Sequence, residues 1–189
     1  WTLALNADGA VPVTRTGTRL ALQTRIPGTI ALLAQQPPAA TLPVDLSRMP
    51  DETFFVTDSG RVVDSSYCAV VRTGVNAVGG QTRRGLFTHP PNNGRTIAAY
   101  LFTLPATPAR FTTGLGLRDG SKSAGVEVAI AVNGQVCARR MIRPGNWDML
   151  DVDLAAWAGT PIVLSLVTDA AGGYDYDWTA WGEPRIVGQ

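Results

Sequence analysis

The sequence predicts an all-β protein, an antiparallel β-sandwich with extra strands at its N-terminal end. Turn-forming residues punctuate the chain about every eight to twelve residues, which is the spacing of short strands. The 189 residues include 20 glycines and 13 prolines, and helical periodicity is nearly absent. Because half-apolar sheets must bury their apolar faces against one another, such a run of short strands favours a sandwich.

The predicted strands follow one another along the chain. Before the sandwich, TRLALQTRI (18–26) alternates polar and apolar residues, and TIALLAQ (29–35) does so less cleanly. Strands or strand pairs then follow at 67–75, 95–104, 109–119, 126–142, 148–154, 161–169 and 181–187. The chain is long enough for one well-buried core.

Two local signals fix particular connections. Asn133-Gly134 lies between two β-rich runs and predicts a type I′ hairpin turn joining 126–132 to 135–142. DLAAWAG (153–159) predicts about one turn of helix, with Asp153 as N-cap and Gly159 just past its end. Trp157 within this turn is most simply a residue that plugs the core.

Residues 35–43, QQPPAATLP, indicate a linker, which divides the chain into an N-terminal segment (1–43) and a main sandwich (44–189). We expect residues 1–34 to form two or three antiparallel strands, which are too few to be stable alone. We expect them to be either the tail of a preceding domain or an extension that pairs with the sandwich. Trp1 as first residue suggests a fragment cut from a longer chain.

Charge and hydropathy limit the classes of binding partner that the sequence predicts. The 16 Lys and Arg are balanced by 15 Asp and Glu, giving a net charge of +1, which argues against nucleic acid. No apolar run of about 18 residues is present, so we expect no membrane insertion by this fragment. Cys68 and Cys137 lack metal-type spacing; two buried free thiols and a disulfide are equally compatible with the sequence.

Catalytic patterns are sparse. The single histidine, His89, would have to serve any Ser-His-Asp triad, and no G-x-S-x-G motif supplies a nucleophile. The pairs Asp175/Asp177 and Asp151/Asp153 are two residues apart, as is common in turns and strand edges. The sequence therefore favours a protein that is not itself an enzyme.

Two segments point to recognition of hydroxyl groups. His89 precedes two prolines that stiffen its loop, and Asn92 and Arg95 follow with planar groups that suit vicinal hydroxyls; a surface histidine without a role is the alternative. In the second segment, Tyr174, Tyr176, Trp178 and Trp181 are interleaved with Asp175 and Asp177. If extended, this stretch would have one aromatic and one acidic face.

The aromatic and acidic stretch has three interpretations. Tyr174, Tyr176 and Trp178 could stack on the C–H face of a sugar while a carboxylate binds its hydroxyls. The acids could instead hold a calcium ion, which prefers loop oxygens. Trp181 directly precedes a strand and is better interpreted as a core residue.

The order of four segments, at 83–96, 109–120, 126–137 and 151–187, resembles the NPCBM type of carbohydrate-binding module. That family has a G-x-G-T-H-A loop, which Gly85, Thr88 and His89 match. Its G-V-D-D strand end is matched in part by Arg118-Asp119. Its closing motif is matched at 163–169 and by the D-x-x-x-W spacing of Asp177 and Trp181.

The resemblance implies a jelly-roll, galactose-binding-like sandwich that binds glycans without catalysis and is appended to a glycan-active enzyme. It implies an extracellular, periplasmic or cell-envelope location and the catalytic domain of a parent chain as partner. The implied carbohydrate-binding residues include His89, Asp119 and Asp177. A structural Ca2+ is also implied, with Asp45 and Glu183 as candidate ligands. Histidine-proline-proline replaces the family's histidine-alanine, and Trp178 replaces a second histidine-like position.

The sequence leaves two alternatives to glycan binding. A purely structural sandwich would dock against a neighbouring domain and expose an apolar patch of several hundred Å2. A hydrolase or lyase would require Asp175, Asp177 or His89 to line a cleft with spaced carboxylates.

Overall fold

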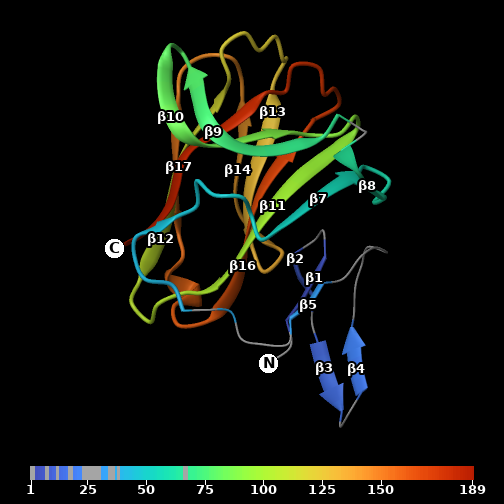
Figure 1. Cartoon of the computed structure of the whole chain (residues 1–189), viewed down its shortest axis with the longest axis vertical. Coiled ribbons are helices and arrows are strands. Elements are labelled where there is room, and N and C mark those ends of the chain that lie inside the picture. Colours follow the sequence, from blue (N-terminus) through green and yellow to red (C-terminus); the bar gives the residue numbers. More distant parts are fainter. Residues whose placement is uncertain are drawn as a thin grey trace.

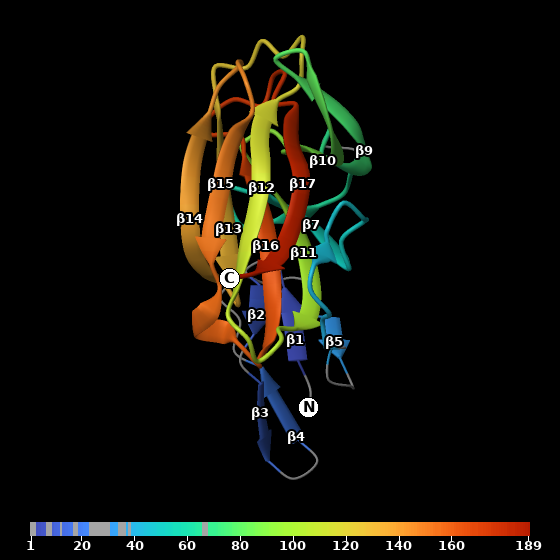
Figure 2. The same cartoon turned by 90° about the vertical axis from the view of Figure 1, so that its left-hand side faces the viewer.

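The computed structural model of the chain describes residues 37, 39–65 and 68–189, together with the backbone of five short strands before them. Those five are β1 (Leu3–Asn6), β2 (Gly9–Val11), β3 (Val13–Thr16), β4 (Arg19–Leu22) and β5 (Ala31–Leu33). They form a three-stranded sheet, β2-β1-β5, and a separate β3-β4 ribbon, so the expected number of two or three strands was too low. Both lie at the lower end of the molecule in Figures 1 and 2, where β2 lies against β16.

The main body is a sandwich of two antiparallel sheets (Figures 1 and 2). The first sheet has the order β15-β12-β17-β10-β9, and β6 pairs with β17. Its strands are β6 (Val44–Asp45), β9 (Val70–Val78), β10 (Gln81–His89), β12 (Ala109–Leu117), β15 (Asp148–Asp153) and β17 (Thr179–Gly188).

The second sheet has the order β14-β13-β16-β11-β7-β8. It consists of β7 (Glu52–Thr57), β8 (Val62–Val63), β11 (Gly94–Thr103), β13 (Val126–Val132), β14 (Gln135–Ile142) and β16 (Pro161–Asp169). Every pairing between the named strands of both sheets is antiparallel. The predicted all-β, antiparallel sandwich is therefore confirmed.

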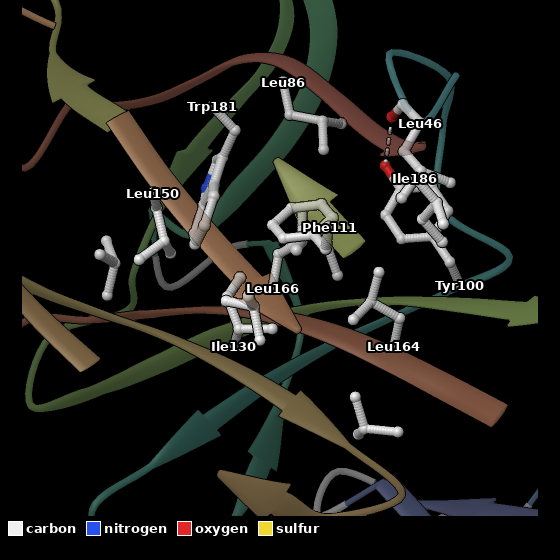
Figure 3. Close-up of a cluster of buried hydrophobic side chains, with 14 of the residues drawn as sticks. Leu46, Leu86, Tyr100, Phe111, Ile130, Leu150, Leu164, Leu166, Trp181 and Ile186 are labelled. Atoms are coloured by element: carbon white, nitrogen blue, oxygen red, sulfur yellow. Dashed lines mark hydrogen bonds between the residues drawn. The ribbon is translucent and has the colours of Figure 1, made fainter. Parts of the chain in front are cut away.

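The core fills the space between the two sheets (Figure 3). Alternate residues of each strand point inward, as strand geometry requires. Phe111 and Trp181 of the first sheet meet Ile130 and Leu166 of the second. Trp181 is fully buried, as the sequence predicts, and its indole N–H donates to Thr88 Oγ1 at 3.0 Å.

Tyr100 ties the start of the sandwich to the core. Its side chain is fully buried, and its hydroxyl donates to the carbonyl oxygen of Leu46 at 2.8 Å (Figure 3). The same hydroxyl lies 2.9 Å from the carbonyl oxygen of Arg48 and donates to it as well. A buried phenol needs such acceptors because an unpaired hydroxyl is costly in an apolar interior.

The predicted hairpin turn and the predicted turn of helix are confirmed, but Leu154 rather than Asp153 is the N-cap residue of that helix. Asn133 and Gly134 have φ values of 51° and 79°, as a type I′ turn between β13 and β14 requires. The predicted helical turn is a 3-10 helix, Ala155–Trp157, whose first N–H donates to Asp153 Oδ1 at 2.8 Å. Trp157 is half-buried and packs against the main core.

Three expectations were wrong. Strands β7 and β10 are not among the predicted segments, and His89 ends β10 rather than sitting within a loop. Both cysteines are free, but Cys68 is exposed rather than buried.

Within the described part of the chain, no helix has the length and apolarity needed to span a membrane.

Candidate functional site

The loop between β16 and β17 (170–178) is a succession of tight turns, not an extended segment. The Gly173 N–H donates to Ala170 O, the Asp177 N–H to Tyr174 O, and the Trp178 N–H to Tyr176 O. Tyr176 has a positive φ of 60°. The predicted separation into one aromatic and one acidic face is therefore wrong, because alternation between faces requires strand geometry.

The turns place two aromatic rings together at the upper end of the sandwich. The rings of Tyr176 and Trp178 lie 5.4 Å apart at an interplanar angle of 57°. Tyr176 is 44% exposed, and Trp178 is half-buried beside Gly120. Lys122 Nζ lies 5.6 Å from the centre of the Tyr176 ring. We call Tyr174, Tyr176, Trp178, Lys122 and His89 the aromatic end.

The β12–β13 loop (118–125) supports the aromatic end through hydrogen bonds to its backbone. Ser121 Oγ donates to the carbonyl oxygen of Tyr176 at 2.7 Å, and the Arg118 N–H donates to Trp178 O at 2.8 Å. The orientation of the two rings therefore depends on two loops that are far apart in sequence.

His89 and Tyr174 form a second pair at this end. Their rings are perpendicular, with centres 5.9 Å apart. His89 Nδ1 lies 2.8 Å from the carbonyl oxygen of Pro90, so this nitrogen carries a proton and donates. Burial lowers the pKa of His89 despite opposing effects from the carbonyls of Pro90 and Cys68 and from Asp175. The structure thus places His89 beside the 170–178 loop.

Asp177 lies beneath the aromatic end and is fully buried. Ser123 Oγ donates to its Oδ1, whereas Oδ2 has no hydrogen-bond partner among the described residues. Burial raises the pKa of Asp177 to about 6, and the neighbouring carboxylate of Asp175 adds to this, while the Ser123 hydrogen bond opposes it. Asp177 can therefore support the loop, but its buried carboxyl does not face solvent.

The structure separates the other predicted carbohydrate-binding residues. Asp119 accepts hydrogen bonds from the N–H groups of Gly79 and Gly80 at 2.7 and 3.1 Å, which pins the β9–β10 hairpin. Asn92 is exposed in the turn between β10 and β11. Arg95 follows in β11 and lies on the outer face of the second sheet, where it lines a groove with Glu127 and Asp169.

The candidate calcium ligands lie on neighbouring strands beside arginine. Asp45 of β6 is paired in register with Arg185 of β17, and Glu183 Oε1 lies 3.6 Å from Arg185 Nη2. The hydrogen bond from Ser47 N–H lowers the pKa of Asp45, and Arg185 and Arg84 contribute.

Ca2+ prefers six to eight oxygen ligands. Within residues 39–65 and 68–189, no group of three or more His, Cys, Asp or Glu side chains is placed to hold a metal. Two carboxylates beside arginine therefore do not fit a calcium centre well.

Sequence reasoning missed Lys122 and the two serines that flank it, although this lysine is the only one in the chain. It also missed Trp147. This indole lies over Gly114 and Gly182 on the outer face of the first sheet, with the Arg83 guanidinium 5.4 Å from its ring. Glycines in two adjacent strands opposite each other are the signal that a large ring covers them.

Comparison with known proteins gives a fold but no family. No protein-family model matches the chain, and no curated protein matches it in sequence. Solved structures do match.

Tandem CBM51 modules of the family 98 glycoside hydrolase Sp3GH98 from Streptococcus pneumoniae align with a TM-score of 0.55 at 13% identity, covering 78% of this chain and 47% of theirs. The chain thus shares the β-sandwich fold of these modules. The CBM51 module of Clostridium perfringens GH95, in complex with methyl-galactose, aligns with a TM-score of 0.52 at 14% identity over 77% of this chain and 99% of that module.

A third similar structure contains the CBM51-2 and INT domains of Clostridium perfringens ZmpB in complex with GlcNAc. It aligns with a TM-score of 0.53 at 15% identity, over 97% of this chain and 39% of that one. The chain thus spans less than half of two of these three structures, each of which contains more than one module or domain.

Proposed function

We propose that the chain is a non-catalytic, glycan-binding accessory module of an extracellular or cell-envelope glycan-active enzyme. The aromatic end carries the proposal: an exposed Tyr176 ring beside Trp178, with the cation of Lys122 next to them, at one end of a carbohydrate-binding-module fold. The resemblance to NPCBM modules, and the likeness to structures that contain methyl-galactose or GlcNAc, support a sugar ligand.

The chemistry of this end suits a neutral sugar. The C–H face of a pyranose stacks on an aromatic ring, and an ammonium group donates hydrogen bonds to hydroxyl oxygens. Tyr176 and Trp178 supply the stacking surface, Lys122 supplies the donor, and His89 and Tyr174 flank it. Asp177 and Asp119 take supporting roles, because one is buried and the other accepts from backbone N–H groups.

A site with so few contacts binds weakly by itself. A module of this kind contributes by holding an attached catalytic domain near its substrate, which raises the local concentration. We therefore expect millimolar affinity for single sugars and tighter binding to surfaces that present many copies.

A glycan array on the intact chain, with and without a calcium chelator, tests the proposal. We expect hits on terminal galactose-type or related neutral sugars, and a loss with chelator would support the structural calcium. Binding should fall in Trp178→Ala and persist in Trp157→Ala, a matched control that removes another half-buried indole from the distant 3-10 helix. If a folded sample with calcium present binds no glycan on the array, the proposal is wrong and a structural module that docks to a neighbouring domain is favoured.

A further inference from the structure

The outer face of the second sheet carries a groove that is separate from the aromatic end. Core residues such as Val128, Ile130 and Leu166 point inward, so their neighbours Ala129, Ala131 and Ser165 point outward. Register places Ala131 opposite Ser165, and Ser165 opposite Ala99 of β11. The groove over these strands has a volume of about 210 Å3.

Ser165 is the most informative residue of this groove. It lines the groove and is only 3% exposed, yet its hydroxyl has no hydrogen-bond partner among the described residues. Burying a hydroxyl without a partner costs free energy, so such a group usually meets water or a ligand. A ligand hydroxyl that replaces such a water keeps the hydrogen bond.

The side chains that line the groove indicate which chemical class of ligand it can bind. Ala129 and Ala131 give a shallow apolar floor, because larger side chains would fill the space. At one end the register brings Arg95, Asp169 and Glu127 side by side on three adjacent strands. Glu127 also pairs with Arg139, which lines the same groove.

The two arginines and two carboxylates balance, so the groove favours a neutral polar ligand over an ion. Planar guanidinium and carboxylate groups bind vicinal hydroxyls in pairs. The volume lies below the range of about 300 to 1,000 Å3 that is typical of sites for drug-sized ligands, which limits the occupant to roughly one ring.

We propose that this groove is a second saccharide site. It binds the edge of one neutral pyranose, and a hydroxyl of that ring forms a hydrogen bond with the Ser165 hydroxyl. The proposal rests on the proposed glycan-binding function but not on the aromatic end, since its residues belong to the outer face of the second sheet. Arg95, which sequence reasoning grouped with His89, belongs to this site.

A 15N NMR titration of the intact chain tests it, with methyl galactoside and N-acetylglucosamine as separate probes. We expect amides at and beside Ala129, Ala131 and Ser165 to shift saturably, and to shift equally in Trp178→Ala. Ser165→Ala should lower the sugar affinity measured at the groove amides about threefold to tenfold, while the affinity measured at the aromatic end stays unchanged. Ala131→Leu should abolish sugar binding in the groove by filling it, whereas the same substitution at exposed Ala106 should leave that binding intact.

The outcomes separate the two sites. If the aromatic end responds and the groove amides do not, the groove proposal is wrong and the proposed function stands. If groove shifts persist in Ala131→Leu, they are indirect and the proposal also fails. If only the groove responds, the second site stands and the aromatic end is not the ligand platform. If neither region responds to either probe, both proposals fail.

Discussion

Asp177→Asn should raise the stability of the chain at neutral pH and remove part of its pH dependence. In the folded protein burial raises the pKa of Asp177 to about 6 from the usual 3.8. The folded state therefore binds the proton more tightly than the unfolded state does. This contribution is fully present below about pH 4 and is lost as the pH rises through 6. Each pKa unit corresponds to 1.36 kcal/mol, so the loss amounts to roughly 2 to 3 kcal/mol.

The assay is urea unfolding of the wild type and Asp177→Asn between about pH 3.5 and 7.5, where carboxylates and histidine titrate. Groups that do not interact with Asp177, such as Asp45 with its lowered pKa, titrate alike in both proteins and cancel in the difference. We expect the difference to grow in favour of the variant between about pH 4 and 6, reduced by the lost hydrogen bond from Ser123 to a charged acceptor. A flat difference, or a variant that is less stable at pH 7, would show that the carboxylate is charged and partnered in the folded state, which contradicts our account.

Three further substitutions test other parts of the fold, each read by urea unfolding. Gly85→Ala should cost about 3 kcal/mol or more, because the added Cβ would clash with the carbonyl oxygen of Trp181 across the β10–β17 pairing; an unchanged midpoint would refute this contact. Tyr100→Phe should cost about 1 to 2 kcal/mol, because the carbonyls of Leu46 and Arg48 lose a buried donor; a neutral effect would mean that water replaces it. Asp119→Ala should cost about 1 kcal/mol through the freed N–H groups of Gly79 and Gly80, and sugar affinity measured in parallel should stay the same; a lost affinity would make Asp119 a ligand residue.

The strand content and its turns were largely predictable because they depend on local chemistry. Asn133-Gly134 adopts the predicted turn because both residues tolerate positive φ. Trp181 is buried as predicted, because it precedes a strand whose inward positions are apolar. Strand β10 escaped prediction since its arginines and glycine weaken the apolar alternation that marks a strand.

The grouping of His89 with Arg95 shows where sequence proximity misleads. His89 ends β10 in the first sheet, and Arg95 lies in β11 of the second. The chain crosses between the sheets at Pro90–Asn93, so residues six apart belong to different faces. No periodicity within the sequence reveals such a crossing, because it depends on which strands pair.

The burial of Asp177 was equally beyond local reasoning. The stretch around it alternates aromatic and acidic residues as a strand would, but the positive φ of Tyr176 turns the chain and sends Asp177 inward. Its partner Ser123 lies 54 residues away in sequence. The acid that the family resemblance implies as ligand-binding thus becomes a support for the rings that we propose to bind.

The most direct test of the central claim is the binding isotherm of the strongest array sugar, measured by calorimetry on the wild type, Trp178→Ala and Trp157→Ala. Loss of a stacked indole should weaken binding by about tenfold or more, which corresponds to at least 1.4 kcal/mol. We predict this loss in Trp178→Ala and wild-type affinity in Trp157→Ala, with both variants folded. Equal affinity in all three proteins would contradict the aromatic end as the glycan-binding site.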